Sequence, residues 1–182
     1  MVVASATIVL LCLSLAAPPA SVAGSHVTPG DPAYGSYVWP VLGPVINGFR
    51  PPSSPYGPGH RGIDIAVPIG TPVAAAADGV VAFAGSIGGN LYVSIDHPDG
   101  VRTTYSYLSS IAVHRGDTVV QGEVVGASGH GHPSIPTDHL HFGARYQGAY
   151  IDPLLLLPAR AVSALIHLAP IPPSVQGGFA RK

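Results

Sequence analysis

The sequence is poor in cysteine and in charge, and both shortages limit what the protein can do. Its one cysteine, Cys12, lies in an apolar segment near the amino terminus, so the rest of the chain has no thiol for a disulfide, a nucleophile or a metal. Any metal site must therefore use histidine and carboxylate ligands. Charged residues make up 9% of the 182 residues and the formal net charge is −1, which argues against the dense positive surface typical of nucleic-acid binding.

A long hydrophobic run is also missing. The uncharged segment Val2–Ala17 falls short of the roughly 18 to 20 apolar residues that a membrane-spanning helix needs. Prolines and the small residues Ser21 and Ala23 follow it, which is the outline of a signal peptide cleaved after Ala23. The segment has no Lys or Arg before the apolar run, and a membrane anchor is the competing interpretation. We expect a signal peptide over residues 1–23 and a secreted protein without a membrane span.

The length allows one compact domain with a core of its own. Glycine (23) and proline (20) punctuate short runs that are rich in β-branched and aromatic residues. Their spacing predicts an all-β fold of largely antiparallel sheets, arranged as a rolled sheet or sandwich. The runs are GIDIAV, TPVAAAA, GVVAFAG, LYVSIDH, VRTTYSYL, AVHRGDTVV, EVVGASG and HLHFGARY.

The remaining segments divide the chain further. We expect a linker over residues 24–37, the domain over 38–158, and a short C-terminal helix and tail over 159–182. Asp152 is the expected N-cap of the helical segment, which Pro158 would limit or kink. His97, in DHPDG, is predicted to lie in a hairpin turn.

Two histidines lie two residues apart in TDHLHFGAR. Side chains at i and i+2 of a strand project from the same face, so His139 and His141 direct two imidazoles at one place. Asp138 would face the opposite way, which argues against it as a partner that orients His139. For an isolated pair, two solvated residues on an open sheet face are the alternative.

A second motif, GHRGIDIA, carries His60 and Asp64. Its spacing alone is also typical of a solvated turn. Together with one histidine of HLH, however, it gives a nitrogen, nitrogen and oxygen set that suits Zn²⁺, with a fourth tetrahedral position left for water. Two neutral imidazoles and one carboxylate leave a charge of about +1 on the ion, which lowers the pKa of a bound water and polarises a carbonyl. The other histidine would then lie within reach of that water as a base.

In this order, HRGID, GVVAFAG, GVRTTYSYLSSIAVHRGDTVVQGEVVGASG and HLHFGAR resemble the lysostaphin-type (LytM-like) zinc endopeptidases. Enzymes of that family cleave peptide cross-links and stems of bacterial peptidoglycan. The resemblance extends roughly from Val45 to Pro153, and it implies an antiparallel β fold with a groove over one sheet. Carried over by motif, it implies that His60, Asp64 and His141 bind zinc and that His139 is the catalytic histidine.

One position departs from the family pattern. The family commonly has a second catalytic histidine in Y-x-H-L, whereas the corresponding stretch here is YSYL, with Tyr107 in the histidine's place. A tyrosine hydroxyl, with a reference pKa near 10, remains a hydrogen-bond donor at neutral pH but is a poor proton acceptor. Tyr107 is therefore predicted to hold a substrate carbonyl oxygen or a developing oxyanion, and it cannot replace a base.

The loop SGHGHPSIPTDHLH offers two further histidines, His130 and His132. Glycines on both sides give the backbone around His130 freedom to fold back over the zinc. The chain also resembles secreted actinobacterial members of the family in WPVLGPVINGF, GHRGIDIA, RTTY and YIDPLLLL, in which a Gly-His pair stands in this loop. That similarity favours His130 as a supplementary catalytic residue. A solvated loop histidine is the alternative for both. Asn47, Arg61 and Arg145 are candidates for lining the groove.

The sequence thus predicts a secreted, cell-wall-associated zinc metalloendopeptidase that hydrolyses peptides of peptidoglycan. A catalytically impaired domain that binds peptidoglycan or regulates another hydrolase is the alternative, and the substitution at Tyr107 favours it. A purely structural zinc site would require a fourth protein ligand, which His130 could supply.

Overall fold

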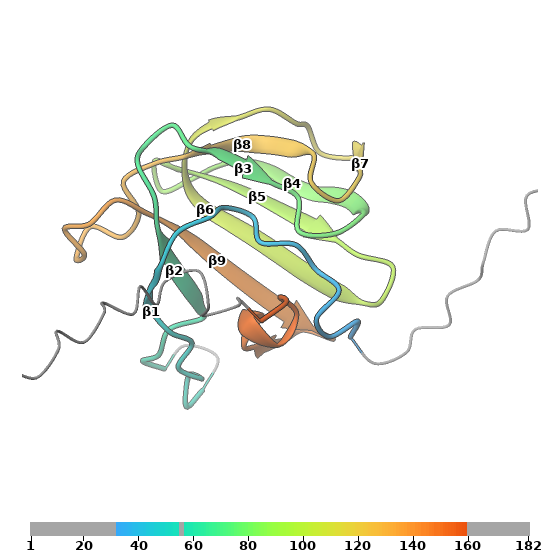
Figure 1. Cartoon of the computed structure of the whole chain (residues 1–182), viewed down its shortest axis with the longest axis horizontal. Coiled ribbons are helices and arrows are strands. Elements are labelled where there is room, and N and C mark those ends of the chain that lie inside the picture. Colours follow the sequence, from blue (N-terminus) through green and yellow to red (C-terminus); the bar gives the residue numbers. More distant parts are fainter. Residues whose placement is uncertain (1–31, 55–56, 160–182) are drawn as a thin grey trace, which may run out of the picture.

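The computed structural model describes residues 32–54 and 57–159, and nearly all regular structure within them is β-strand. The all-β prediction is confirmed (Figure 1). The strands are β1 (Val45–Asn47), β2 (Gly62–Ala66), β3 (Pro72–Ala74), β4 (Gly79–Ile87), β5 (Asn90–Asp96), β6 (Val101–Ile111), β7 (Thr118–Val119), β8 (Val124–Ser128), β9 (His139–Tyr146) and β10 (Ala149–Ile151).

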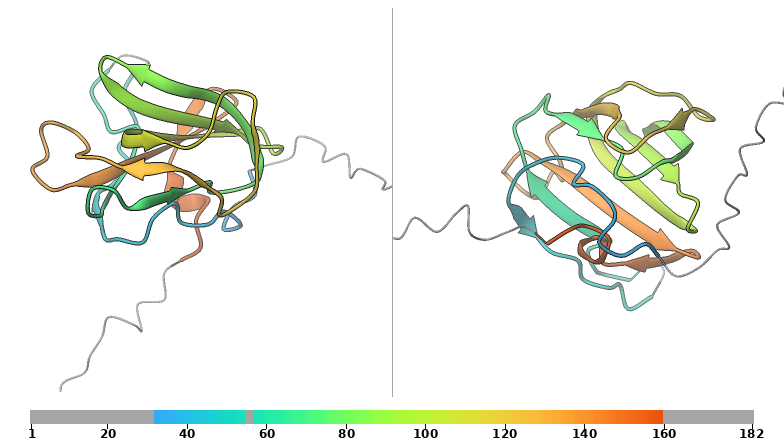
Figure 2. Two further views of the ribbon diagram at one scale, coloured as in Figure 1. Left: turned by 90° about the horizontal axis from the view of Figure 1, so that it is seen from above. Right: turned by 45° about the vertical axis from the view of Figure 1, so that its right-hand side comes forward.

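All strand pairings are antiparallel, and β6 connects the two parts of the fold. The main order is β1-β2-β9-β6-β5-β4-β7, with β10 beside β9 and β3 beside β8. The first part of β6, Val101–Ser106, pairs with β9, whereas its last part, Leu108–Ile111, pairs with β8. Tyr107 is therefore the residue at which β6 changes partner and the sheet begins to roll over. β3 and β8 lie apart from β2 and β9 (Figure 1), and Figure 2 shows the rolled sheet from two further sides.

The core fills the space that this roll encloses. Both isoleucines of β2 are fully buried, and Leu140, Phe142 and Ala144 of β9 are at most 1% exposed. These residues alternate along the strands with residues of the opposite face. Tyr105 lies among the buried apolar residues with no exposed surface, and its hydroxyl accepts a hydrogen bond of 2.7 Å from the Ala76 amide. Burial raises the pKa of Tyr105 to about 12, so this hydroxyl stays neutral.

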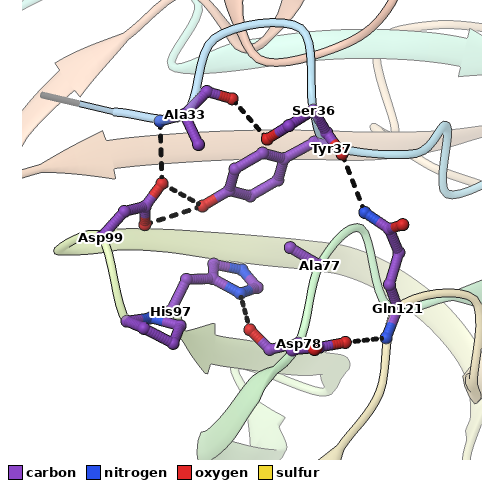
Figure 3. A pocket seen from close by; sticks show the side chains of 9 residues that line it. Ala33, Ser36, Tyr37, Ala77, Asp78, His97, Asp99 and Gln121 are labelled. Carbon is purple, nitrogen blue, oxygen red and sulfur yellow. Dashed lines mark hydrogen bonds between the residues drawn. The ribbon is translucent and has the colours of Figure 1, made fainter. Parts of the chain in front are cut away.

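The end of the predicted linker is packed on the domain. Tyr37 is 2% exposed, and its hydroxyl donates to the carboxylate of Asp99 at 2.9 Å. The same carboxylate accepts the backbone N–H of Ala33 at 3.0 Å (Figure 3). Residues 24–31, the first part of that linker, lie outside the described residues, as does the predicted signal peptide over 1–23.

After β10 the chain forms one short 3₁₀ helix, Pro153–Leu155. Asp152 is its N-cap, as predicted, because its carboxylate accepts the N–H of Leu154 at 3.0 Å. The predicted helix and tail beyond residue 159 lie outside the described residues. Among the residues that are described, no helix is long and apolar enough to cross a membrane.

His97 begins the hairpin turn in which the sequence placed it, but its side chain is buried. Its ring nitrogens lie 2.8 Å from the Asp78 carbonyl and 2.8 Å from the Thr103 hydroxyl, and Tyr37 meets the ring edge-on (Figure 3). Burial lowers the pKa of His97 because it disfavours the charged imidazolium.

This burial predicts a pH-dependent stability. The lowered folded-state pKa means that only the unfolded chain takes up the proton readily near pH 6.5. The contribution of His97 is therefore complete above about pH 6.5 and is lost as the pH falls towards the folded-state pKa. Urea unfolding between about pH 7.5 and 5 should show a steeper loss of stability for the wild type than for His97→Gln. The other histidines are the same in both proteins, so the difference isolates His97, and parallel curves would contradict the prediction.

Candidate metal centre

The pairing of β2 with β9 builds the centre. In its register Asp64 stands directly opposite His141, so the two side chains leave the sheet on one face. His60 precedes β2 and is held by two backbone hydrogen bonds with Arg50, whose carbonyl and amide pair with it at 2.8 and 3.0 Å. Both His60 and Asp64 are buried. The three predicted ligands thus come from two segments far apart in the sequence.

The three ligand atoms form a close triangle. His60 Nε2 lies 3.1 Å from Asp64 Oδ1 and 3.1 Å from His141 Nδ1, and the last two atoms are 2.8 Å apart. Zinc bonds of 2.0–2.1 Å in tetrahedral geometry place ligand atoms about 3.3 Å apart. The residues therefore fit a zinc ion both in chemical type and in spacing.

Charge in the centre also suits a cation. Burial alone would raise the pKa of Asp64, but its contacts with the surrounding histidines and the hydrogen bond from Asn47 hold it well below the usual range. The carboxylate is therefore negative at any ordinary pH. Burial lowers the pKa of His141 and favours the neutral imidazole that a metal ligand requires.

Outer contacts orient these ligands. His60 Nδ1 lies 2.8 Å from the Gly48 carbonyl, which can only accept, so the proton sits on Nδ1 and Nε2 keeps its lone pair. Asn47 donates to Asp64 Oδ2 at 2.9 Å and leaves Oδ1 for the metal. Asn47, which the sequence suggested only as a groove residue, thus has a positioning role.

Close approach of the strands requires Gly62. A Cβ at this position would lie 2.3 Å from the Phe142 carbonyl oxygen and 2.9 Å from His141 Nε2. Any larger residue would push β2 away from β9 and separate Asp64 from His141.

His139 lies beside the triangle with no exposed surface. Its Nδ1 is 2.6 Å from the Thr137 carbonyl and must carry the proton, which leaves a lone pair on Nε2, 3.8 Å from Asp64 Oδ1. This is the tautomer of a base. Asp138 does not orient the ring, as strand alternation indicated. The Nε2 lone pair is not free, however, because it accepts the backbone N–H of His132 at 2.9 Å.

The two loop histidines have exchanged their expected places. His130 projects into solvent, where its Nδ1 lies 3.0 Å from Asp138 Oδ1, and it makes no contact with the triangle. His132 instead enters the centre, with Nε2 3.0 Å from His141 Nδ1 and 3.5 Å from Asp64 Oδ1. The reason is the backbone at Gly131, whose φ of +81° turns the chain inward only after His130.

Tyr107 faces the centre from β6. Its ring centroid lies 4.7 Å from that of His132 and 6.5 Å from that of His141. Tyr107 has a φ of +61°, which is rare for an aromatic residue and lies where β6 changes partner. Burial, together with the neighbouring Tyr92, raises the pKa of Tyr107, so its hydroxyl remains a donor, as predicted.

Residues 58–153 match the family described as peptidase family M23. The chain belongs to this family. It is 36% identical over 168 residues to the uncharacterized protein Rv2891 of Mycobacterium tuberculosis, an alignment that covers 88% of this chain and 63% of that protein. The present chain thus spans less than two thirds of this relative's length.

Two solved peptidase structures resemble the fold. The catalytic domain of the antimicrobial peptidase lysostaphin from Staphylococcus simulans superposes with a TM-score of 0.51 at 31% identity, covering 59% of this chain and 86% of that domain. A zinc-containing peptidase from Vibrio cholerae gives 0.56 at 28% identity, covering 68% of this chain and 40% of that chain. The resemblance to lysostaphin-type enzymes is confirmed.

Removing the amide that orients Asp64 should weaken metal binding. We expect Asn47→Ala to raise the zinc dissociation constant by about 10- to 100-fold, the usual cost of losing an outer-shell partner. Competition with a chromophoric chelator measures this constant. Asn90→Ala, at the exposed start of β5, is the control and should bind zinc like the wild type. Equal affinities for Asn47→Ala and the control would show that Asn47 does not position the ligand.

Proposed function

We propose that this M23 protein is a secreted zinc metalloendopeptidase that hydrolyses peptide bonds of bacterial cell-wall peptidoglycan. The convergence of His60, Asp64 and His141, with the lone pair of His139 beside them, is the observation that carries the proposal. Zinc, when bound, would supply a Lewis acid that polarises the scissile carbonyl and activates a water molecule. Secretion rests on the predicted signal peptide over residues 1–23.

The protein's own residues have separate tasks in this reaction. His60, Asp64 and His141 hold the ion, while His139 Nε2 takes the proton from the attacking water and passes it to the leaving amine. The Thr137 carbonyl keeps the proton on Nδ1 of that ring and so keeps the base in the required tautomer. Tyr107 donates from its hydroxyl to the oxyanion that forms on the substrate.

A groove next to His141 supports a peptide with carboxylates as the substrate. A cavity of about 220 Å³ runs from His141 past Tyr92 to Arg61, Arg145 and Tyr150. Both guanidinium groups lie over the ring of Tyr150, at 5.6 and 4.1 Å from its centroid. Two cations along one groove suit the carboxylates of peptidoglycan stems, because arginine pairs with a carboxylate through two hydrogen bonds.

The central test removes one metal ligand. His141→Ala should abolish the release of new amino termini from purified peptidoglycan and reduce bound zinc well below one ion per chain, because the ion loses the β9 ligand that stands opposite Asp64. His114→Ala, at a side chain that is 92% exposed, should release amino termini at the wild-type rate. Undiminished release by His141→Ala would rule out the proposed site.

The role of Tyr107 is tested separately. Tyr107→Phe keeps the ring but removes the donor, so kcat should fall by up to about 10²- to 10³-fold while zinc content stays the same. Tyr34→Phe, at an exposed tyrosine outside the centre, serves as the control. An unchanged kcat in Tyr107→Phe would exclude Tyr107 as the oxyanion donor.

A second candidate function is a domain that binds peptidoglycan or regulates another hydrolase without cutting. Two observations favour it: tyrosine stands where the family commonly has a histidine, and His132 lies over the centre. Zinc-loaded protein that sediments with cell walls yet releases no amino termini would support this function over hydrolysis.

A further inference from the structure

The loop of residues 129–138, here called the closing loop, joins β8 to β9 and makes two contacts with the centre. The side chain of His132 lies next to the ligand atoms, and the backbone N–H of the same residue donates a hydrogen bond to Nε2 of His139. One residue thus engages both the metal position and the base.

The first contact has the geometry of a ligand. His132 Nε2 lies 3.0 Å from His141 Nδ1 and 3.5 Å from Asp64 Oδ1. Both distances are close to the roughly 3.3 Å expected between two ligand atoms of one tetrahedral zinc. One donor atom from each of His60, Asp64, His132 and His141 can be chosen so that all four lie within 4.8 Å of one another. A histidine that acted only on a bound water would stand further from the ligand atoms.

The second contact depends on Gly131. This residue is buried against the ring of His139, and a Cβ added to it would lie 2.2 Å from His139 Cε1. Its φ of +81° is also unfavourable for any other residue. Only glycine therefore lets the loop close far enough for the next N–H to reach His139.

Beyond these two contacts, the ring of His132 lies beside Tyr107, and at the end of the closing loop the Val67 N–H donates to the Asp138 carbonyl at 3.2 Å. Most of the loop's remaining residues are exposed, and the pair between His130 and Asp138 is on the surface, where such pairs contribute little to stability. A segment with few buried contacts opens at low free-energy cost. The loop can therefore leave the centre without unfolding the sheet that carries the other three ligands.

We infer that His132 is a fourth protein ligand of the zinc and that the closing loop holds the protein in a closed resting state. In this state the fourth coordination position and the lone pair of His139 are both taken, so a peptide substrate must displace the loop before hydrolysis. The inference rests on the proposed zinc peptidase function and adds its regulation.

The test counts ligands in the zinc-loaded, purified protein. X-ray absorption at the zinc edge should find three imidazoles in the wild type and two in both His132→Ala and Gly131→Ala. The zinc dissociation constant should rise at least about tenfold in both variants, because even outer-shell changes reach that size. Gly116→Ala is the matched control: Gly116 has a φ of +96° but no atom within 4 Å of an added Cβ, so the strain is similar without a clash. It should retain three imidazoles.

Hydrolysis supplies the second readout. If the loop blocks the base, Gly131→Ala should release amino termini from peptidoglycan faster than Gly116→Ala at saturating zinc.

Two imidazoles in the wild type, or unchanged zinc affinity in His132→Ala, would overturn the inference but leave the proposed peptidase intact. Lost hydrolysis in His132→Ala with zinc affinity retained would make His132 a catalytic residue and also overturn it. A wild-type protein that binds no zinc would remove the proposed function itself.

Discussion

The register between β2 and β9 is the constraint on which the centre depends. It sets Asp64 opposite His141 and leaves His139 two residues away on the same strand. Side chains alternate along a strand, so a slip of one residue would turn both histidines to the opposite face. Gly62 permits the close contact, and the fully buried isoleucines that flank Asp64 fix the register through the core. Packing of apolar side chains therefore determines the geometry of the polar site.

The buried carboxylate of Asp64 needs a cation or hydrogen-bond donors beside it to offset its charge. Asp64 has no exposed surface, and an unpaired charge there would cost several kcal/mol. Its partners are histidines and one amide, and histidine nitrogens 2.8 to 3.5 Å from the carboxylate oxygen are placed to share a metal ion with it. Zinc binding and the stability of this part of the fold are consequently linked.

Much of this could be predicted from the sequence, because the strands and the ligand motifs are local patterns. GIDIA carries Asp64 and HLHFGARY carries His141, so the strand signal also located these two ligands. His60 stands two residues before GIDIA in the same motif. The choice between His130 and His132 was different, since it depends on the path of a loop. Gly131 and Pro133 flank His132, and a proline restricts the residue before it to extended backbone, which was the available signal. The burial of His97 had no such local signal, because Tyr37 and Asp78 reach it from distant segments.

The tyrosine in YSYL and the histidine of the closing loop can be understood together. The rings of Tyr107 and His132 lie 4.7 Å apart, so the loop brings an imidazole next to the place where the family commonly has one on β6. A histidine at position 107 would be held by β6, because Ser106 and Leu108 on either side of it pair with neighbouring strands, whereas His132 moves with a loop whose residues are mostly exposed. An imidazole on a strand stays in the site, whereas an imidazole on the closing loop leaves the site when the loop opens. The backbone of Tyr107 has a positive φ because β6 changes partner at this residue while the side chain still faces the centre.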